Sequence, residues 1–108
     1  MNFEIIPTPD FVKDIKPLIK KYPSLRQELL QLQHNLLNNP TLGEPLGKDC
    51  YKIRLSIASK GKGKSGGARV ITCVKIINEI IFMVAIYDKS EMENIDDNVL
   101  KERLNKIR

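Results

Sequence analysis

The chain has 108 residues and a formal net charge of +5 at pH 7, and 42% of its residues are hydrophobic. This length is enough for one hydrophobic core and too short for two, so we expect a single domain over residues 1–108. No long apolar run occurs, and the first residues show no basic segment followed by an apolar one. We therefore expect a soluble, cytoplasmic protein with no membrane partner.

Cysteine and histidine are too sparse to predict a metal centre. The spacing of Cys50 and Cys73 fits neither a disulfide framework nor a Cys-x-x-Cys knuckle. Because both adjoin apolar, strand-like runs, we expect them to be small buried side chains. His34, the single histidine, has no ligand partner at a suitable spacing. The sequence thus predicts neither a metal nor a cofactor.

The first residues predict a short strand and a helix. Residues 3–6 form the expected strand, which Pro7 ends. Thr8 then provides an N-cap and Pro9 a first-turn proline for the helix. Pro17 should kink or break that helix.

A second helix is predicted after Ser24. Ser24 and Gln27 have the spacing of a capping box, and Asn38-Asn39-Pro40 should end the helix. The expected buried stripe consists of Leu25, Leu29, Leu32, Leu36 and Leu37.

The second half of the chain predicts three strands and a last helix. Residues 41–49 are typical of a loop, and from Cys50 the period changes to two, with a basic face that contains Lys52 and Arg54. Two apolar runs, residues 68–77 and 80–87, should form a hairpin with a two-residue turn. The expected last helix begins at Asp96 or Asp97, and its stripe consists of Val99, Leu100, Arg103, Leu104 and Ile107.

The element order is therefore β-α-α-β-β-β-α. This order predicts an α+β fold, a small antiparallel sheet with the N-terminal helices packed on one face and the other face left for binding.

Positive charge is concentrated in one quarter of the chain. Between Lys48 and Lys75 there are eight Lys or Arg residues and one acid, a local charge of +7, whereas the other residues sum to −2. Such a distribution indicates a polyanionic partner, first of all a nucleic acid.

A glycine- and lysine-rich stretch lies in the middle of this basic run. Residues 61–66 match the letters of a dinucleotide fingerprint and part of a P-loop, but a strand follows them where both motifs need a helix. The stretch is therefore either a solvated hairpin loop or a loop that grips a phosphate backbone through Lys60, Lys62 and Lys64. The neighbouring basic strand favours the second interpretation.

Lys52 and Arg54 should stand on one strand face, about 7 Å apart. They either guard a sheet edge against aggregation or, with Arg69 on the next strand, form a cluster that binds an anion. The cluster is favoured, because like charges repel unless an anion lies between them. Lys89, after the last strand, either joins it or pairs with a nearby acid.

Three motifs resemble the RelE/ParE toxin superfamily of bacterial type II toxin–antitoxin systems, and its HigB-like branch in particular. They are Asp49-Cys50-Tyr51-Lys52-Ile53-Arg54-Leu55, Ser65-Gly66-Gly67-Ala68-Arg69-Val70-Ile71 and Ile86-Tyr87-Asp88-Lys89-Ser90-Glu91. The resemblance implies a microbial-RNase-like RelE fold and cleavage of mRNA in the ribosomal A site. Some relatives carry a base-stacking tyrosine near the last helix, where this chain has Ile95.

The resemblance implies that the catalytic residues are Lys52, Arg54, Arg69 and Lys89. Elementary chemistry agrees, since attack by a 2′-hydroxyl needs a base, cations around the phosphorus and an acid, and the basic run contains no His or Glu. We expect Lys52 to be the base, the two arginines to hold the phosphate and Lys89 to be an acid or a further clamp. The expected RNA-binding residues are Lys48, Lys60, Lys62, Lys64 and Lys75.

The leading hypothesis is thus a metal-independent, ribosome-dependent mRNA endonuclease. Its expected partners are the ribosome, mRNA and a cognate antitoxin encoded beside the gene. The alternatives are a ParE-like toxin that inhibits DNA gyrase without cleaving RNA, and a plain nucleic-acid-binding module.

Overall fold

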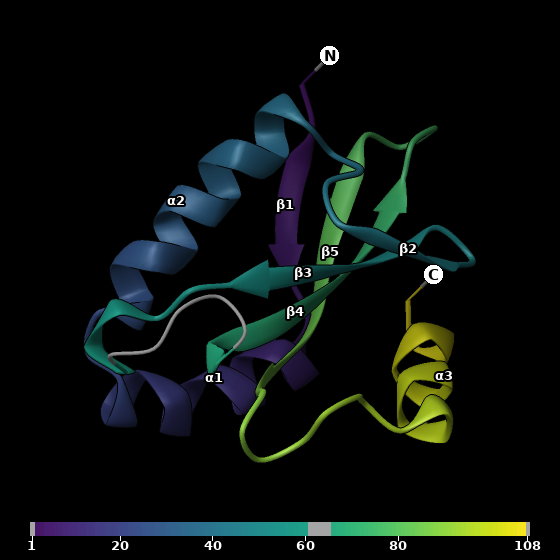
Figure 1. Cartoon of the computed structure of the whole chain (residues 1–108). Coiled ribbons are helices and arrows are strands. Elements are labelled where there is room, and N and C mark those ends of the chain that lie inside the picture. Colours follow the sequence, from purple (N-terminus) through teal and green to yellow (C-terminus); the bar gives the residue numbers. More distant parts are fainter. Residues whose placement is uncertain (1, 61–65, 108) are drawn as a thin grey trace.

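The computed structural model describes residues 2–60 and 66–107. They form one five-stranded sheet with helices on both faces (Figure 1). The elements are β1 (Glu4–Pro7), α1 (Pro9–Lys21), α2 (Leu25–Asn38), β2 (Glu44–Gly47), β3 (Cys50–Leu55), the 3-10 turn η1 (Ala58–Lys60), β4 (Ala68–Lys75), β5 (Ile80–Asp88) and α3 (Asp97–Asn105).

The strand order is β1-β5-β4-β3-β2. Strands β3, β4 and β5 pair antiparallel, as predicted, β2 pairs antiparallel with β3, and β1 joins the other edge parallel to β5. The α+β class is confirmed, with one addition to the sheet. Residues 44–47, expected in a loop, form the edge strand β2, which the sequence conceals because all four residues are exposed and show no alternation.

The β2–β3 connection shows why residues 41–49 resembled a loop. Lys48 and Asp49 have φ angles of 54° and 64°, as a tight two-residue hairpin turn requires. Gly43, which precedes β2, has a φ of 110°, and a Cβ atom there would lie 2.6 Å from the carbonyl oxygen of Lys52. The glycine therefore lets the chain approach β3 closely enough to add a strand.

Helix α1 begins as predicted. The Thr8 hydroxyl oxygen accepts a hydrogen bond from the Phe11 amide at 3.2 Å, which caps the helix. Of the kink or break expected at Pro17, the break is wrong, because α1 continues to Lys21. Phe11 and Leu18 are buried on the two sides of the proline, so packing against the sheet outweighs the missing hydrogen bond.

Helix α2 ends at Asn38 as expected, but its capping box is wrong. The Ser24 hydroxyl donates to Glu28 and accepts from the Ser59 amide, so it ties the helix start to the segment after β3. Leu37 is also misplaced, since it is 47% exposed whereas Leu36 is fully buried. Because successive side chains point in different directions around a helix, Leu37 lies outside the stripe that faces the sheet.

The last hairpin and the last helix differ from the prediction in detail. The turn between β4 and β5 spans residues 76–79 instead of two residues, and Glu79 has a φ of 57°. Asp96 caps α3 by accepting from the Asn98 and Val99 amides at 2.8 and 3.3 Å. Val99 itself is 42% exposed and lies outside the buried stripe.

Two hydrophobic clusters lie on opposite faces of the sheet. Helices α1 and α2 cover one face, where Phe11, Leu25 and Leu36 pack against β3, β4 and β5. Helix α3 covers part of the other face (Figure 1). Its Leu100 and Leu104 are partly buried and pack against the second cluster. This second face of the sheet was expected to be left open for binding. That expectation is wrong for the part under α3, and the remaining part carries the pocket described below.

Replacing Leu36 with alanine tests the core on the helix-covered face. Because Leu36 is fully buried, the change should lower the free energy of unfolding by about 2–5 kcal/mol in urea titrations. Leu37→Ala is the matched control and should cost less than about 1 kcal/mol. Equal losses for the two variants would contradict the helix orientation.

Candidate functional site

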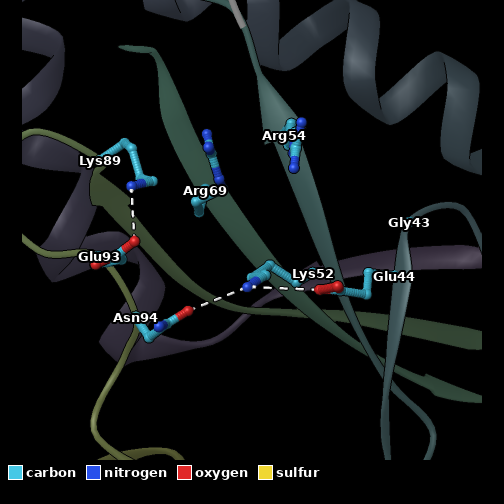
Figure 2. A pocket seen from close by; sticks show the side chains of 8 residues that line it. All are labelled: Gly43, Glu44, Lys52, Arg54, Arg69, Lys89, Glu93 and Asn94. Atoms are coloured by element: carbon cyan, nitrogen blue, oxygen red, sulfur yellow. Dashed lines mark hydrogen bonds and ion pairs between the residues drawn. The ribbon is translucent and has the colours of Figure 1, made fainter. Parts of the chain in front are cut away.

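A pocket of about 570 Å³ opens on the sheet face that α3 leaves uncovered. Strands β3 and β4, the end of β5, the segment before α3 and the start of β2 build its walls (Figure 2). It is lined by Gly43, Glu44, Lys52, Arg54, Arg69, Lys89, Glu93 and Asn94. The structure thus brings together all four cations that the sequence singled out as catalytic.

The register of β3 and β4 places the two arginines side by side. Arg54 lies directly opposite Arg69, and Lys52 lies two residues along β3 on the same face. Arg69 is only 4% exposed, and its guanidinium donates to the Ala68 carbonyl at 3.1 Å. Like charges directly opposite in a sheet are destabilising, so this arrangement favours a bound anion. Two guanidinium groups suit a phosphate, which accepts paired hydrogen bonds from each.

Both pocket lysines contact oxygen atoms of neighbouring side chains. Lys52 Nζ donates to Asn94 Oδ1 at 3.1 Å and lies 3.6 Å from Glu44 Oε2. Lys89 Nζ lies 3.6 Å from Glu93 Oε1 (Figure 2). These contacts position the two ammonium groups at the pocket wall.

Sequence reasoning missed Glu44, Glu93 and Asn94. Glu44 reaches the pocket only because β2 pairs with β3, opposite Lys52. Glu93 follows Lys89 by four residues. That spacing would have indicated an ion pair if this segment had been expected to form a turn beside the pocket. The pocket therefore contains two glutamates, a residue type that the basic run itself lacks.

Lys60 does not take the position expected of an RNA-binding residue. Its side chain is 7% exposed, and its Nζ lies 2.5 Å from Asp88 Oδ1, a carboxylate that is 1% exposed. Lys60 Nζ also donates to the Gly66 carbonyl. A cation enclosed in this way is not available to grip a phosphate backbone, so the expectation for Lys60 is contradicted.

The other expected RNA-binding lysines are separated from the pocket or lie outside the described residues. Lys75 ends β4 opposite Ile80, about 20 Å along the strand from Arg69. Lys48 is in the β2–β3 turn and lines a different cavity, beside α3. Lys62 and Lys64 fall within residues 61–65, which the structure does not describe.

Tyr87 is a buried residue beneath the pocket. It is opposite Arg69 on β5 and 5% exposed, and Ile95 packs against the same cluster. Burial raises the pKa of Tyr87, against the opposing effects of the Ile95 backbone and Arg69. The ring thus packs in the core beneath the pocket.

The fold and the pocket define a small α+β protein whose sheet presents a cluster of cations suited to a phosphate. No helix in the described part of the chain is long and apolar enough to cross a membrane. Residues 19–106 match the family described as the RelE toxin of the RelE / RelB toxin-antitoxin system, so the chain belongs to the RelE toxin family.

A solved structure supports the same fold. A double mutant of the E. coli toxin RelE, in the free state, superposes with a TM-score of 0.66 over 100% of both chains, at 19% sequence identity. The predicted RelE-like fold is therefore confirmed.

The buried pair between Lys60 and Asp88 makes a pH-dependent contribution to stability. Burial alone would raise the pKa of Asp88, but hydrogen bonds from Lys60, Ser90 and Tyr22 outweigh it and hold that pKa well below its usual range. The unfolded chain therefore binds the proton more readily. The contribution is complete above the unfolded pKa of about 4 and is lost as the pH falls toward the folded value.

Lys60→Met tests this pair. The variant leaves a buried carboxylate without its cation and should lower the free energy of unfolding by about 3 kcal/mol at pH 7. Urea titrations from pH 7 to pH 2 should also show a shallower acid slope in Asp88→Asn than in the unmodified protein. Lys21→Met, which breaks the exposed pair with Glu91, is the control and should not shift the urea midpoint. A Lys60 variant as stable as this control would contradict the structural role of Lys60.

Proposed function

We propose that the chain is a ribosome-dependent mRNA endonuclease that acts as the toxin of a toxin–antitoxin system. The observation that carries the proposal is the convergence of Lys52, Arg54, Arg69 and Lys89 on one pocket in a member of the RelE toxin family. The long Lys-Gly stretch before β4 supports placement in the HigB-like branch.

The proposed reaction uses the 2′-hydroxyl of the RNA as the nucleophile. Once the Lys52 ammonium has released a proton to solvent, its amine accepts the hydroxyl proton, the 2′-oxygen attacks phosphorus, and Arg54 with Arg69 stabilises the charge on the pentacoordinate phosphate. The bond from phosphorus to the 5′-oxygen then breaks, and Lys89 supplies the proton to that oxygen. The products are a 2′,3′-cyclic phosphate and a 5′-hydroxyl end, and no metal takes part in these steps.

Glu44 and Glu93 have a different role in this proposal. Their side chains are 63% and 80% exposed, and each lies beside a pocket lysine. An incoming phosphate competes with both carboxylates for the ammonium groups. We therefore assign them to holding the lysines in place before RNA binds, and not to proton transfer.

The ribosome would supply what the pocket lacks. Positioning alone can contribute a large part of a rate enhancement, and a ribosome holds mRNA in a defined path. This partner places the protein in the cytoplasm. A cognate antitoxin with an acidic segment would neutralise the arginine pair during storage.

Arg69→Ala and Lys89→Ala test the pocket cations. Each should reduce mRNA cleavage on purified ribosomes by about 10²-fold or more, because each removes charge stabilisation or a proton donor. Growth arrest on expression should disappear in parallel. Lys75→Ala is the matched control, since Lys75 lies at the other end of β4, and it should cleave at the unmodified rate.

Two results would contradict the proposal. Folded Arg69 and Lys89 variants that stay fully toxic would exclude the pocket as the catalytic site. Loss of DNA supercoiling by gyrase with intact mRNA would instead support the ParE-like alternative.

Glu93→Gln and Glu44→Gln test the assignment of the base. Both variants should cleave mRNA within about tenfold of the unmodified rate, whereas Lys52→Ala should lose about 10²- to 10⁴-fold. Single-turnover rates on programmed ribosomes provide the measurement. A loss of 10²-fold or more in either glutamate variant would transfer the role of base from Lys52 to that carboxylate.

A further inference from the structure

The two cysteines of the chain face each other across neighbouring strands. Cys50 on β3 is the register partner of Cys73 on β4, and each is 2% exposed. Both side chains belong to the cluster on the α3 side of the sheet. The sequence indicated two separate buried residues, and the hairpin register makes them a pair.

The hydrogen bonds around the pair determine how close the side chains are. The Val74 amide donates to the Asp49 carbonyl at 2.9 Å, just outside the pair, so Cys50 and Cys73 occupy a non-hydrogen-bonded position. At such positions the Cα atoms are about 4.5 Å apart and the side chains approach most closely. Disulfides span Cα separations of about 4.4–6.8 Å, so the backbone already allows the bond.

The thiols also interact with each other. The neighbouring Cys50 thiol lowers the pKa of Cys73 to about 7, helped by Lys75 and opposed by burial. The same contact raises the pKa of Cys50. Of the two, Cys73 is therefore the one that more readily forms the thiolate, the form that reacts with oxidants, and Cys50 is the thiol beside it.

A small oxidant has a place to enter. Cys50 lines a cavity of about 230 Å³ between the β2–β3 turn and α3. Leu46, Leu100 and Leu104 form apolar parts of its wall, and Lys48 and Lys101 also line it. Its volume admits a molecule of the size of hydrogen peroxide beside Cys50, and Cys73 lies directly opposite Cys50 on the next strand.

We propose that Cys50 and Cys73 form a site of reversible oxidation, at which a peroxide joins β3 to β4 through a disulfide. The Cys73 thiolate attacks a peroxide oxygen, the O–O bond breaks, and hydroxide leaves with a proton to become water. Cys50 sulfur then attacks the sulfenic acid of Cys73, the S–O bond breaks, and a second water leaves. Two thiols are oxidised and one hydrogen peroxide is reduced to two waters.

The disulfide would cross-link the strands that carry three of the pocket cations. Cys50, Lys52 and Arg54 alternate along one face of β3, and Cys73 and Arg69 lie on the matching face of β4. Lys52 is about 7 Å along the strand from the cross-link. This site rests on strand register and burial alone, so it stands or falls independently of the proposed RNA cleavage.

Peroxide titration of the reduced, full-length protein tests the proposal. After stoichiometric hydrogen peroxide, both thiols should disappear in a denaturing thiol assay, and the intact mass should fall by two hydrogen atoms with no disulfide between chains. Peptide mapping should recover Cys50 linked to Cys73. The melting temperature should rise by about 5 °C or more and return to its starting value with dithiothreitol.

Single variants provide the matched controls. Cys50→Ser should gain oxygen on Cys73 without a cross-link, and Cys73→Ser should react much more slowly because the thiolate is gone. The proposal is overturned if the unmodified protein keeps both thiols, gains oxygen without losing hydrogen, or forms only disulfides between chains.

Discussion

One buried carboxylate, Asp88, holds together the end of the sheet on which the pocket depends. It ends β5, and it accepts hydrogen bonds from Lys60 at 2.5 Å, Tyr22 at 2.7 Å and Ser90 at 2.7 and 2.9 Å. These donors come from the end of α1, the segment after β3 and the chain beyond β5. Three parts of the chain that are distant in sequence therefore meet at one charge.

The position of the pocket cations follows from this contact. Asp88 is the register partner of Ala68, the residue before Arg69, and the next amide, that of Lys89, donates to the Gly67 carbonyl at 3.0 Å. Arg69 and Lys89 therefore directly follow the pair of residues, Ala68 and Asp88, at which β4 and β5 meet. Burying an ion pair costs desolvation energy, and a fully hydrogen-bonded carboxylate offsets that cost while allowing one geometry. A cluster of like charges needs such a rigid support, because repulsion would otherwise spread it apart.

The periodicity of apolar residues and the positions of charged residues predicted the fold and most of the pocket. The features that they did not predict depend on contacts between residues distant in sequence. Alternation along β3 placed Lys52 and Arg54 on one face, and that prediction needed no knowledge of the partner strand. The position of Lys60 was not predictable in this way, since its charge suggests solvent and only the folded chain brings it to Asp88. Glu44 was missed for a related reason: β2 is a strand because β3 offers it an edge, and its own residues show no strand pattern. The local sequence pattern thus indicates which strand face is basic. Tertiary contacts determine which cations line the pocket and which, like Lys60, are buried in an ion pair.

The central claim is that the pocket cations promote attack by a 2′-hydroxyl on the neighbouring phosphate. The chemical ends of mRNA cut on purified, programmed ribosomes test that claim most directly. The downstream fragment should carry a 5′-hydroxyl and the upstream one a 2′,3′-cyclic or 3′-phosphate. Fragments with 5′-phosphate and 3′-hydroxyl ends, or mRNA that stays intact while growth stops, would contradict it.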